Sequence, residues 1–468
     1  MEQQKAERKL SFPEAALTLA VTVAVMFIGI IGLGLDPYLP LLIDIGVILC
    51  AGRIKGFSWG EMVGSMMEFL GNNTGTIGVI LIIGVVIGSF MTCGAVPFVI
   101  YYGLKLMSVK WFFVCAVLMC FVMALLTGSS FTSVSTLGVA FMGVGMSLGI
   151  PPAMAAGAII SAALAGDKHS PLSAVQNLAA PLCGVTVYES EKCTRYTTLP
   201  TLAFIAAAFT IMGSKYSSSA ADTTQVDRIM EGIAEHYNLS PLTVLPLLLL
   251  LVLVILKIPA FPTLIISSLV GVAFSMAVQH ESLIDCLQYL QTGYVADTGV
   301  ELLDTLLTRG GLFSMTSVVI LIMLGLSLAG GMSRLQVMAI LMERISSALR
   351  SRFSVLFGTF VMSFLLVLIS SDTYMAMVLT VESMKKCFER AGIHPVVMSR
   401  CIIDGGCSMC GAIPWCVAGM FFAETLGVPV LEFIPYYLLG VGTVVFTLIS
   451  AATGIGVKYI KTADEGVQ

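Results

Sequence analysis

Long apolar runs without charges dominate this chain and limit what it can fold into. A helix that crosses a bilayer needs roughly 20 apolar residues, and lipid admits only helices and closed barrels. The runs show no alternation of the kind that barrel strands require. They therefore predict an all-α polytopic membrane protein with roughly 12 transmembrane segments. Examples are the runs at residues 15–35, 111–126, 244–256, 258–278, 317–330 and 433–452.

The composition agrees with a membrane protein. Of the 468 residues, 57% are hydrophobic and 11% are charged, whereas soluble domains carry about 25% charged residues. The net charge of −4 and the lack of a basic stretch give no indication of nucleic-acid binding. Most of the 12 cysteines lie within apolar runs, where cysteine behaves as a small apolar residue, so we expect no disulfide framework.

The N-terminal residues predict the orientation. The first apolar run is too long for a cleavable signal peptide, and no small-residue cleavage site follows it. Lys5, Arg8 and Lys9 precede this run, and basic residues favour the cytoplasmic side. We expect a multi-pass protein of the inner (cytoplasmic) cell membrane, in contact with lipid, with its N-terminus in the cytoplasm.

A hydrophilic segment at residues 213–241 divides the chain, and we interpret it as a linker with a short helix. It separates a first transmembrane repeat, 12–212, from a second, 242–456. An offset of 243 aligns Gly149-Ile-Pro-Pro with Gly392-Ile-His-Pro, and Gly184-Val with Gly427-Val. Two loops of the second half are far richer in basic residues than their first-half counterparts, which favours inverted repeats. Such repeats are typical of secondary transporters.

Four places interrupt the apolar helices with polar or helix-breaking residues, and the offset groups them into two matched pairs. An unwound helix frees backbone groups that protein, water or a ligand must satisfy. Its carbonyl groups suit a cation and its N–H groups suit an anion. The alternative is that Gly and Pro merely kink packed helices. The matched pairs, which carry acids, favour re-entrant or broken helices that meet near the midplane. The four breaks cover residues 127–135, 165–177, 369–375 and 404–415.

Ionisable residues in or beside these breaks are the candidate site. A charge at the bilayer centre costs several kcal/mol, so an acid there needs a reason. Asp167, Asp372 and Asp404 are the candidate Na⁺-binding carboxylates. Neutral oxygens are hard ligands that suit Na⁺. The candidate neutral ligands are Ser129, Ser130, Thr132, Ser170, Ser173, Asn177 and Thr373.

The charged residues of "GDKHSPLS" have structural interpretations as well. Asp167 is compatible with capping a half-helix that starts near Ser170. Lys168 is expected to pair with an acid across the bundle or to compensate the charge of an empty site. His169 is more often a hydrogen-bonded structural residue, although an ordinary pKa near 6.5 also suits a proton carrier. The "CSMC" stretch at 407–410 suits tight helix packing better than a metal.

The stretch "GDKHSPLSAVQNLA" resembles the signature GDKxSPLSDTTNLA of the NhaC-type sodium/proton antiporters, part of the ion transporter superfamily. "SSDTYM", "SRCIIDGGC" and "IPWCVAGMFFAETLGVP" follow in the family's order, and the similarity covers about residues 14–450. The resemblance implies inverted repeats and exchange of Na⁺ for H⁺. Some members couple this exchange to malate or lactate, and related proteins have been assigned amino-acid substrates.

The chain departs from the family's pattern at four positions, three of them in the signature. Ala174 replaces an aspartate, Val175 and Gln176 replace threonines, and Cys416 stands where an asparagine is common. The loss of a carboxylate beside the expected ion site indicates either fewer bound cations or a site shaped for an organic solute.

We therefore expect alternating access in which Na⁺ and H⁺ compete for buried carboxylates, since a desolvated carboxyl group holds its proton more tightly. The alternative is Na⁺- or H⁺-coupled transport of a small organic anion or amino acid. No cofactor is expected beyond Na⁺ and H⁺ as transported or coupling ions. A catalytic motif and a P-loop are both missing from the sequence, which argues against an enzyme or a primary pump. Dimers are common among transporters, so a homodimer is an open alternative.

Overall fold

The computed structural model describes residues 10–106, 109–217, 223–256 and 258–460. Lys5, Arg8 and Lys9, which carry the orientation prediction, lie outside these residues. All the named elements in the described part are helices, and the β-bridges there, Tyr294 with Arg309 and Ile393 with Tyr459, are isolated. The all-α expectation is therefore confirmed.

The first half of the chain contributes the helices up to α12, with π-helical turns at Ile28–Gly32 and Val134–Gly138. These helices are α2 (Phe12–Phe27), α3 (Tyr38–Ile54), α4 (Trp59–Asn72), α5 (Thr74–Thr92), α6 (Ala95–Leu106), α7 (Val109–Thr127), α8 (Ser130–Ser133), α9 (Val139–Ser147), α10 (Pro152–Lys168), α11 (Ala174–Leu182) and α12 (Val187–Ser217). Because α12 continues to Ser217, the hydrophilic segment predicted at 213–241 begins inside a helix.

The second half starts after α13 (Thr223–His236), which lies within that hydrophilic segment. Its helices are α14 (Leu245–Ile255), α15 (Ala260–Val278), α16 (Leu283–Thr292), α17 (Glu301–Leu307), α18 (Thr316–Arg334), α19 (Val337–Ala348), α20 (Arg352–Ser370), α21 (Thr373–Arg390), α22 (Pro395–Cys410), α23 (Val417–Leu426), α24 (Val430–Phe433) and α25 (Leu438–Thr453).

Helix length and hydropathy agree with a multi-pass membrane protein. Within the described residues, 6 helices are long and apolar enough to cross a membrane, or up to 9 if each bent helix pair counts as one span. The six are Phe12–Ile30, Ser130–Ser147, Val187–Ser214, Ala260–Val278, Leu312–Arg334 and Arg352–Ser370. The shorter helices at the breaks fall below this length, so the dozen segments read from the sequence stay a prediction.

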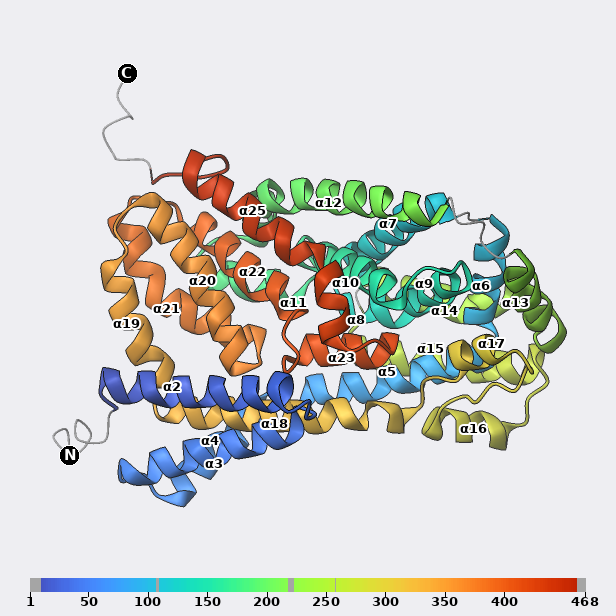
Figure 1. Ribbon diagram of the computed structural model, residues 1–468, viewed down its shortest axis with the longest axis horizontal. Helices are drawn as coiled ribbons and strands as arrows, with labels where there is room; N and C mark the ends of the chain where they lie inside the picture. Colours follow the sequence, from blue (N-terminus) through green and yellow to red (C-terminus); the bar gives the residue numbers. More distant parts are fainter. Residues whose placement is uncertain (1–9, 107–108, 218–222, 257, 461–468) are drawn as a thin grey trace.

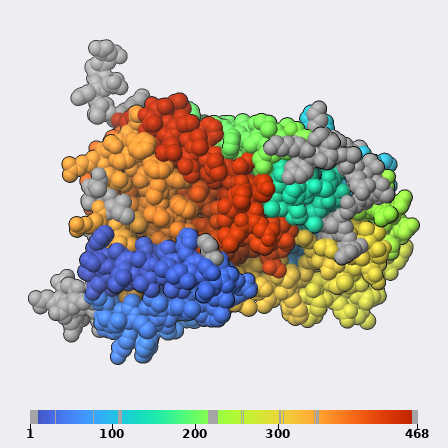
Figure 2. Space-filling model, viewed as in Figure 1, coloured from blue at the N-terminus to red at the C-terminus, as the bar shows by residue number. Residues whose placement is uncertain are grey.

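The two halves are interleaved. Figure 1 shows α19, α20 and α21 at the end of the long axis where the N-terminus lies, and α6, α13, α16 and α17 at the other end. Helices α3 and α4 pack against α18, and α2 packs against α19, while α15 packs against α5. Figure 2 shows the N-terminal helices (blue) seated against the second half (orange and red). Each half thus covers the other with its first helices.

Glycines allow the central helices to approach closely, as small residues do in membrane bundles. A Cβ added to Gly166 of α10 would lie 2.3 Å from the carbonyl oxygen of Phe121 in α7. A Cβ added to Gly405 of α22 would lie 2.2 Å from the carbonyl oxygen of Phe360 in α20. The central pairs α7–α10 and α20–α22 therefore pack backbone against backbone.

We predict that Gly405→Ala separates α20 from α22 and lowers thermal stability, because a neighbouring backbone cannot move aside cheaply. Overpacking costs roughly 1–3 kcal/mol. Gly46→Ala in α3 is the matched control, since its added Cβ meets nothing within 4 Å. Detergent-solubilised variants compared by thermal unfolding should show a loss for Gly405→Ala alone. Equal melting temperatures would contradict the packing argument.

Candidate functional site

Three of the four predicted helix breaks are confirmed where the sequence places them. Helix α7 ends at Thr127 and α8 begins at Ser130. Helix α10 ends at Lys168, and α11 begins only at Ala174. Helix α20 ends at Ser370, and α21 begins at Thr373. At each of these places one helix thus ends within the bundle and the next begins a few residues later.

The fourth break was predicted to begin at Asp404, and this start is wrong. Helix α22 continues to Cys410, and the interruption covers 411–416 before α23 begins at Val417. Gly405 and Gly406 follow Asp404 but do not end the helix. They instead allow α22 to pack closely on α20. Asp404 therefore lies inside a helix, well before the break.

The two breaks of the first half touch each other at Gly128. This residue has φ +66°, which is the left-handed region that favours glycine. A Cβ here would also lie 2.6 Å from the carbonyl carbon of Leu172 in the second break. No other residue type fits both the dihedral angle and the space, so Gly128 brings the two interruptions into contact.

Asp167 joins these two breaks through its carboxylate. It lies in the last turn of α10 and is 7% exposed. One carboxylate oxygen accepts hydrogen bonds from the N–H of Ser130 (2.9 Å) and from its Oγ (2.7 Å). The other accepts from Oγ of Ser173 at 2.5 Å. Three hydrogen bonds from two helix starts therefore hold one buried carboxylate.

This geometry corrects the capping role predicted for Asp167. The helix that follows it begins at Ala174, and Ser173 caps that helix by accepting from the N–H of Val175 at 3.1 Å. Asp167 instead accepts from the N–H of Ser130, the first residue of α8. Its carboxylate stabilises the helix start of the other break, where a negative charge is favoured.

Asp372 occupies the corresponding place in the second half. It is the N-cap of α21, and its Oδ1 accepts from the N–H of Met375 at 2.6 Å. Ser371 before it has φ +59°. Asp372 and Asp167 line the same cavity of about 70 Å³, together with Thr373 and Tyr374. This volume exceeds that of one water probe, so the cavity has room for a small cation or a few waters.

A larger cavity of about 650 Å³ also reaches Asp167. Its polar lining includes Ser129 and Thr132, and its apolar lining includes residues of α5, α14 and α15. Ala174, which replaces the signature aspartate, lines this cavity as well. Tyr374 lines both this cavity and the smaller one. Asp167 therefore lines both a wide vestibule, which has one carboxylate fewer than the signature, and a much smaller cavity.

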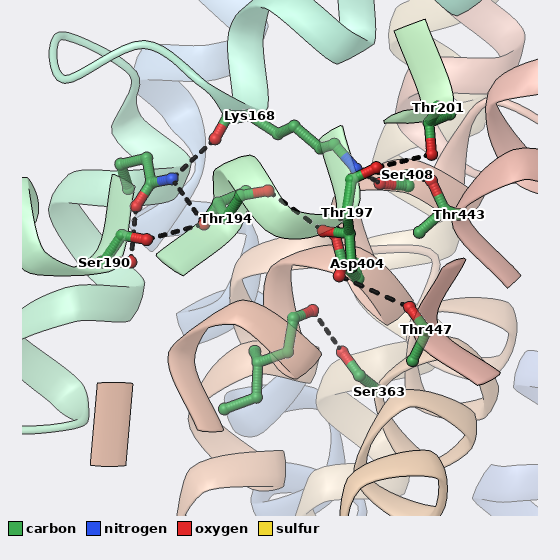
Figure 3. A network of polar contacts seen from close by, with 12 residues as sticks. Lys168, Ser190, Thr194, Thr197, Thr201, Ser363, Asp404, Ser408, Thr443 and Thr447 are labelled. Atoms are coloured by element: carbon green, nitrogen blue, oxygen red, sulfur yellow. Dashed lines mark hydrogen bonds and ion pairs between the residues drawn. The ribbon is translucent and has the colours of Figure 1, made fainter. Parts of the chain in front are cut away.

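Lys168, the next residue, makes the cross-bundle pair expected of it. Its Nζ lies 3.0 Å from Oδ1 of Asp404, and both side chains are 0% exposed. Figure 3 shows the lysine reaching across to Asp404 and the hydroxyl groups around it. Nζ also donates to Ser408 at 2.9 Å and Thr443 at 3.4 Å, and Thr447 donates to Asp404 at 3.5 Å. The pair ties α10 to α22 and α25.

Gln176, another departure from the signature, supports the backbone beside this pair. Its side-chain amide donates to the carbonyl oxygen of Lys168 at 2.6 Å and to Oγ1 of Thr194 at 3.3 Å. Its own oxygen accepts from Ser190 at 2.7 Å. The glutamine is fully buried and fastens the break after α10 to α12.

The structure does not bring every predicted ligand to Asp167. Ser170 donates its hydroxyl to the carbonyl oxygen of Leu125 at 2.7 Å. Asn177 is exposed and donates to the carbonyl oxygens of Pro171 and Ser173. His169 lies 3.1 Å from Glu191, in agreement with its structural interpretation. These three side chains shape the loop after α10.

Several residues at the site escaped the sequence reasoning, among them Tyr374, Ser408, Thr443 and Thr447. None carries a charge or breaks a helix, so none stood out. The spacing of Thr443 and Thr447, four residues apart on α25, was a usable signal, because it places both hydroxyls on one helix face. In the described part of the chain, no three His, Cys, Asp or Glu side chains gather as a metal site would require. Asp167 and Asp372 are the two carboxylates that line the small cavity.

Broken helices that meet at a buried carboxylate, in a polytopic helical protein, define the class of secondary active transporters. Residues 163–455 match the model of a family described as the Na⁺/H⁺ antiporter family. The chain belongs to this family. It is 31% identical over 453 residues to the Na⁺/H⁺ antiporter NhaC of Alkalihalophilus pseudofirmus. This alignment covers 96% of this chain and 97% of the relative.

Two further relatives carry other names. The chain is 30% identical over 464 residues to the arginine/ornithine antiporter ArcD of Halobacterium salinarum, across 98% of this chain and 95% of the relative. It is 28% identical over 448 residues to the malate-2H⁺/Na⁺-lactate antiporter of Bacillus subtilis, across 96% of each chain. The family relationship thus spans the whole scaffold.

We predict that removing one partner of the buried Lys168–Asp404 pair is strongly destabilising, by about 3–5 kcal/mol, because it leaves an unpaired charge. Lys168→Met and Asp404→Leu alone should each lower the thermal unfolding temperature, and the double variant should recover most of the loss. Arg334→Gln breaks an exposed ion pair with Glu61 and serves as control, with an expected change below about 1 kcal/mol. A double variant no more stable than the single ones would contradict this prediction.

Proposed function

We propose that this chain exchanges Na⁺ for H⁺ across the cell membrane by alternating access, with the two ions competing for Asp167. The observation that carries the proposal is the position of this carboxylate, between a cavity of about 650 Å³ and one of about 70 Å³. Hydroxyl groups of Ser130 and Ser173 contact its two oxygens. Either hydroxyl can turn its oxygen toward a cation when Na⁺ arrives.

Competition follows from charge. A proton and a Na⁺ ion each neutralise one negative charge on Asp167, so a buried carboxylate accommodates one of them at a time. We assign Asp372 as the second carboxylate of the ion site, because it lines the same small cavity. Asp404 is held by Lys168, so we now assign it to balance that charge and no longer to bind Na⁺.

We further propose two inverted repeats, 12–212 and 242–456, joined by the linker 213–241 and comprising roughly 12 segments. Helix starts recur at a constant separation of 243 residues, as do positive-φ positions. The helix starts are Ser130 and Thr373, Pro152 and Pro395, and Ala174 and Val417. The positive-φ positions are Gly128 and Ser371, Gly149 and Gly392, and Gly184 and Gly427.

The repeat matches one helix cap with another. Ser129 caps α8 by accepting from the N–H of Thr132, and Asp372 caps α21 by accepting from the N–H of Met375. These positions are again 243 residues apart. The same cap is thus neutral in one half and acidic in the other, which supports an asymmetric ion site built on a symmetric scaffold.

We place the N-terminus in the cytoplasm and lipid around the bundle. Large apolar side chains are exposed on the outward faces of several helices, for example Leu118 (48%) on α7 and Leu269 (59%) on α15. Such side chains favour a hydrocarbon environment. The homodimer stays an expectation from other transporters.

We predict that Asp167→Asn abolishes Na⁺-dependent proton movement, because the amide neither takes up a proton nor carries a charge for Na⁺. The measurement uses membrane vesicles with a pH-sensitive dye, and we expect at least a roughly tenfold loss of rate, as for removing an interaction worth 1.4 kcal/mol or more. Asp285→Asn is the control, since this carboxylate lies at an exposed helix start and bonds to Ser282. Undiminished exchange in Asp167→Asn would refute the assignment.

A second candidate is Na⁺- or H⁺-coupled transport of a small organic anion or amino acid on the same scaffold. The vestibule of about 650 Å³ favours it, because solute sites commonly occupy 300–1,000 Å³ whereas a bare cation needs far less. Ala174 leaves room where the signature has an aspartate. The names of the malate/lactate and arginine/ornithine antiporters agree with a solute.

Flux in proteoliposomes separates the two candidates. Labelled malate, lactate and amino acids are offered one at a time under an imposed Na⁺ or H⁺ gradient. Gradient-driven uptake of any of them supports the second candidate. Na⁺/H⁺ exchange that proceeds without solute and is unaffected by all of them contradicts it.

A further inference from the structure

A third cavity lies away from Asp167, between the loop that follows α17, helix α5 and the C-terminal end of α23. Its volume is about 340 Å³. None of its lining residues also lines either of the cavities at Asp167. Arg309, Glu424 and Thr425 line it, so it carries a base, an acid and a hydroxyl.

Arg309 presents donors to this cavity. In the described part of the chain its guanidinium makes one hydrogen bond, from Nη1 to the carbonyl oxygen of Thr425 at 3.0 Å. A guanidinium has five N–H donors, so four remain for water or a ligand. The group lies against Gly427, where an added Cβ would be 2.9 Å from Nη2. A glycine at this helix end permits the approach.

The backbone around Arg309 is fixed in place. The N–H of Tyr294 donates to the carbonyl oxygen of Arg309 at 3.2 Å. The next two residues, Gly310 and Gly311, both have positive φ, and the N–H of Gly311 donates to the carbonyl oxygen of Gly84 in α5 at 2.7 Å. The start of the Arg309 side chain is therefore held in place beside the cavity.

A buried polar group beside this cavity has no partner among the described residues. Oγ1 of Thr425 makes no hydrogen bond within the described chain, although the residue is only 3% exposed. Such a group costs free energy unless something binds it. Glu424 is exposed, and no ion pair joins it to Arg309 among the described residues. The acid and the base therefore line one space without forming an ion pair with each other.

We propose that this cavity binds a small zwitterionic solute, a free amino acid, with its carboxylate on Arg309 and its ammonium group on Glu424. Arginine holds a carboxylate through two parallel N–H donors, which gives both strength and direction. Opposite charges at separate places complement a solute with one charge of each sign. The volume is within the range of small-molecule sites.

Helix α23 connects this cavity to the ion site. Val417 and Ala418 at its start line the small cavity that contains Asp167 and Asp372. Glu424 and Thr425 at its end line the Arg309 cavity. Ala418 and Thr425 are about 10 Å apart along the helix, from a rise of 1.5 Å per residue. Transport of an amino acid bound here rests on the second candidate function. Binding of the amino acid at this cavity does not depend on it.

Binding to the purified full-length protein in detergent tests the proposal. The probes are L-alanine, L-leucine, L-arginine and L-glutamate, measured by calorimetric titration. Propionate and 4-methylpentanoate lack the ammonium group of alanine and leucine, while ethylamine and 3-methylbutylamine lack the carboxylate. We expect at least one amino acid to bind, and analogues lacking either group to bind roughly tenfold or more weakly. A complete lack of amino-acid binding overturns the proposal, as does equal affinity for an analogue.

Variants locate the binding. Arg309→Gln should weaken the binding of amino acids and of the carboxylate analogues. Glu424→Gln, at an exposed position, should weaken the binding of amino acids but not of the carboxylate analogues. Arg352→Gln is the matched control, because Arg352 is also half-buried and donates to the main-chain carbonyls of Ala451 and Ala452 but lines none of these three cavities. Wild-type affinity in both Arg309→Gln and Glu424→Gln overturns the site.

Na⁺/H⁺ exchange is measured on the same preparation. Exchange without amino-acid binding overturns this inference and leaves the antiport proposal intact. Binding that depends on Arg309, in a protein without exchange, supports this inference and overturns the antiport proposal.

Discussion

The carboxylate of Asp167 organises the centre of the molecule. Interruptions of a helix inside a membrane leave backbone N–H groups that lipid cannot satisfy. Asp167 accepts from the first N–H of α8 and from the hydroxyls of Ser130 and Ser173, so it stabilises both breaks of the first half at once. The N–H of Ser130 at the start of α8 finds its acceptor in this carboxylate, and the residues of the two breaks bury the carboxylate in turn. An ion that competes for this carboxylate therefore acts on the geometry of both helix starts.

Two adjacent residues at the end of α10 point to different surroundings. Asp167 points to the cavities, where its charge is available to ions, whereas Lys168 points to Asp404 in a fully enclosed pair. The enclosed pair fastens α10 to the second half, and Gln176 fastens the following loop to α12. The proposed ion site thus lies next to an enclosed polar core.

Much of this could be predicted from local sequence, and the rest depends on contacts between distant segments. Gly128, Ser371 and the "GDKHSPLS" loop mark their breaks because helix-breaking and capping residues act locally. The break predicted to begin at Asp404 was wrong, because a Gly-Gly pair can either end a helix or let it pack closely on a neighbour. Gly405 lies against the carbonyl oxygen of Phe360, so here the glycines serve close packing. The partner of Lys168 is 236 residues away, and no local pattern encodes that separation. The same is true of Asp167 and α8.

The most direct test of the account is Na⁺ binding to the purified protein as a function of pH, measured by calorimetry. If Na⁺ and H⁺ compete for Asp167, the apparent dissociation constant for Na⁺ should rise roughly tenfold for each unit that the pH falls on the acidic side, because one proton must leave for each ion bound. Asp167→Asn should bind Na⁺ weakly at every pH. A Na⁺ affinity that does not change with pH, or one retained in Asp167→Asn, would contradict the central claim.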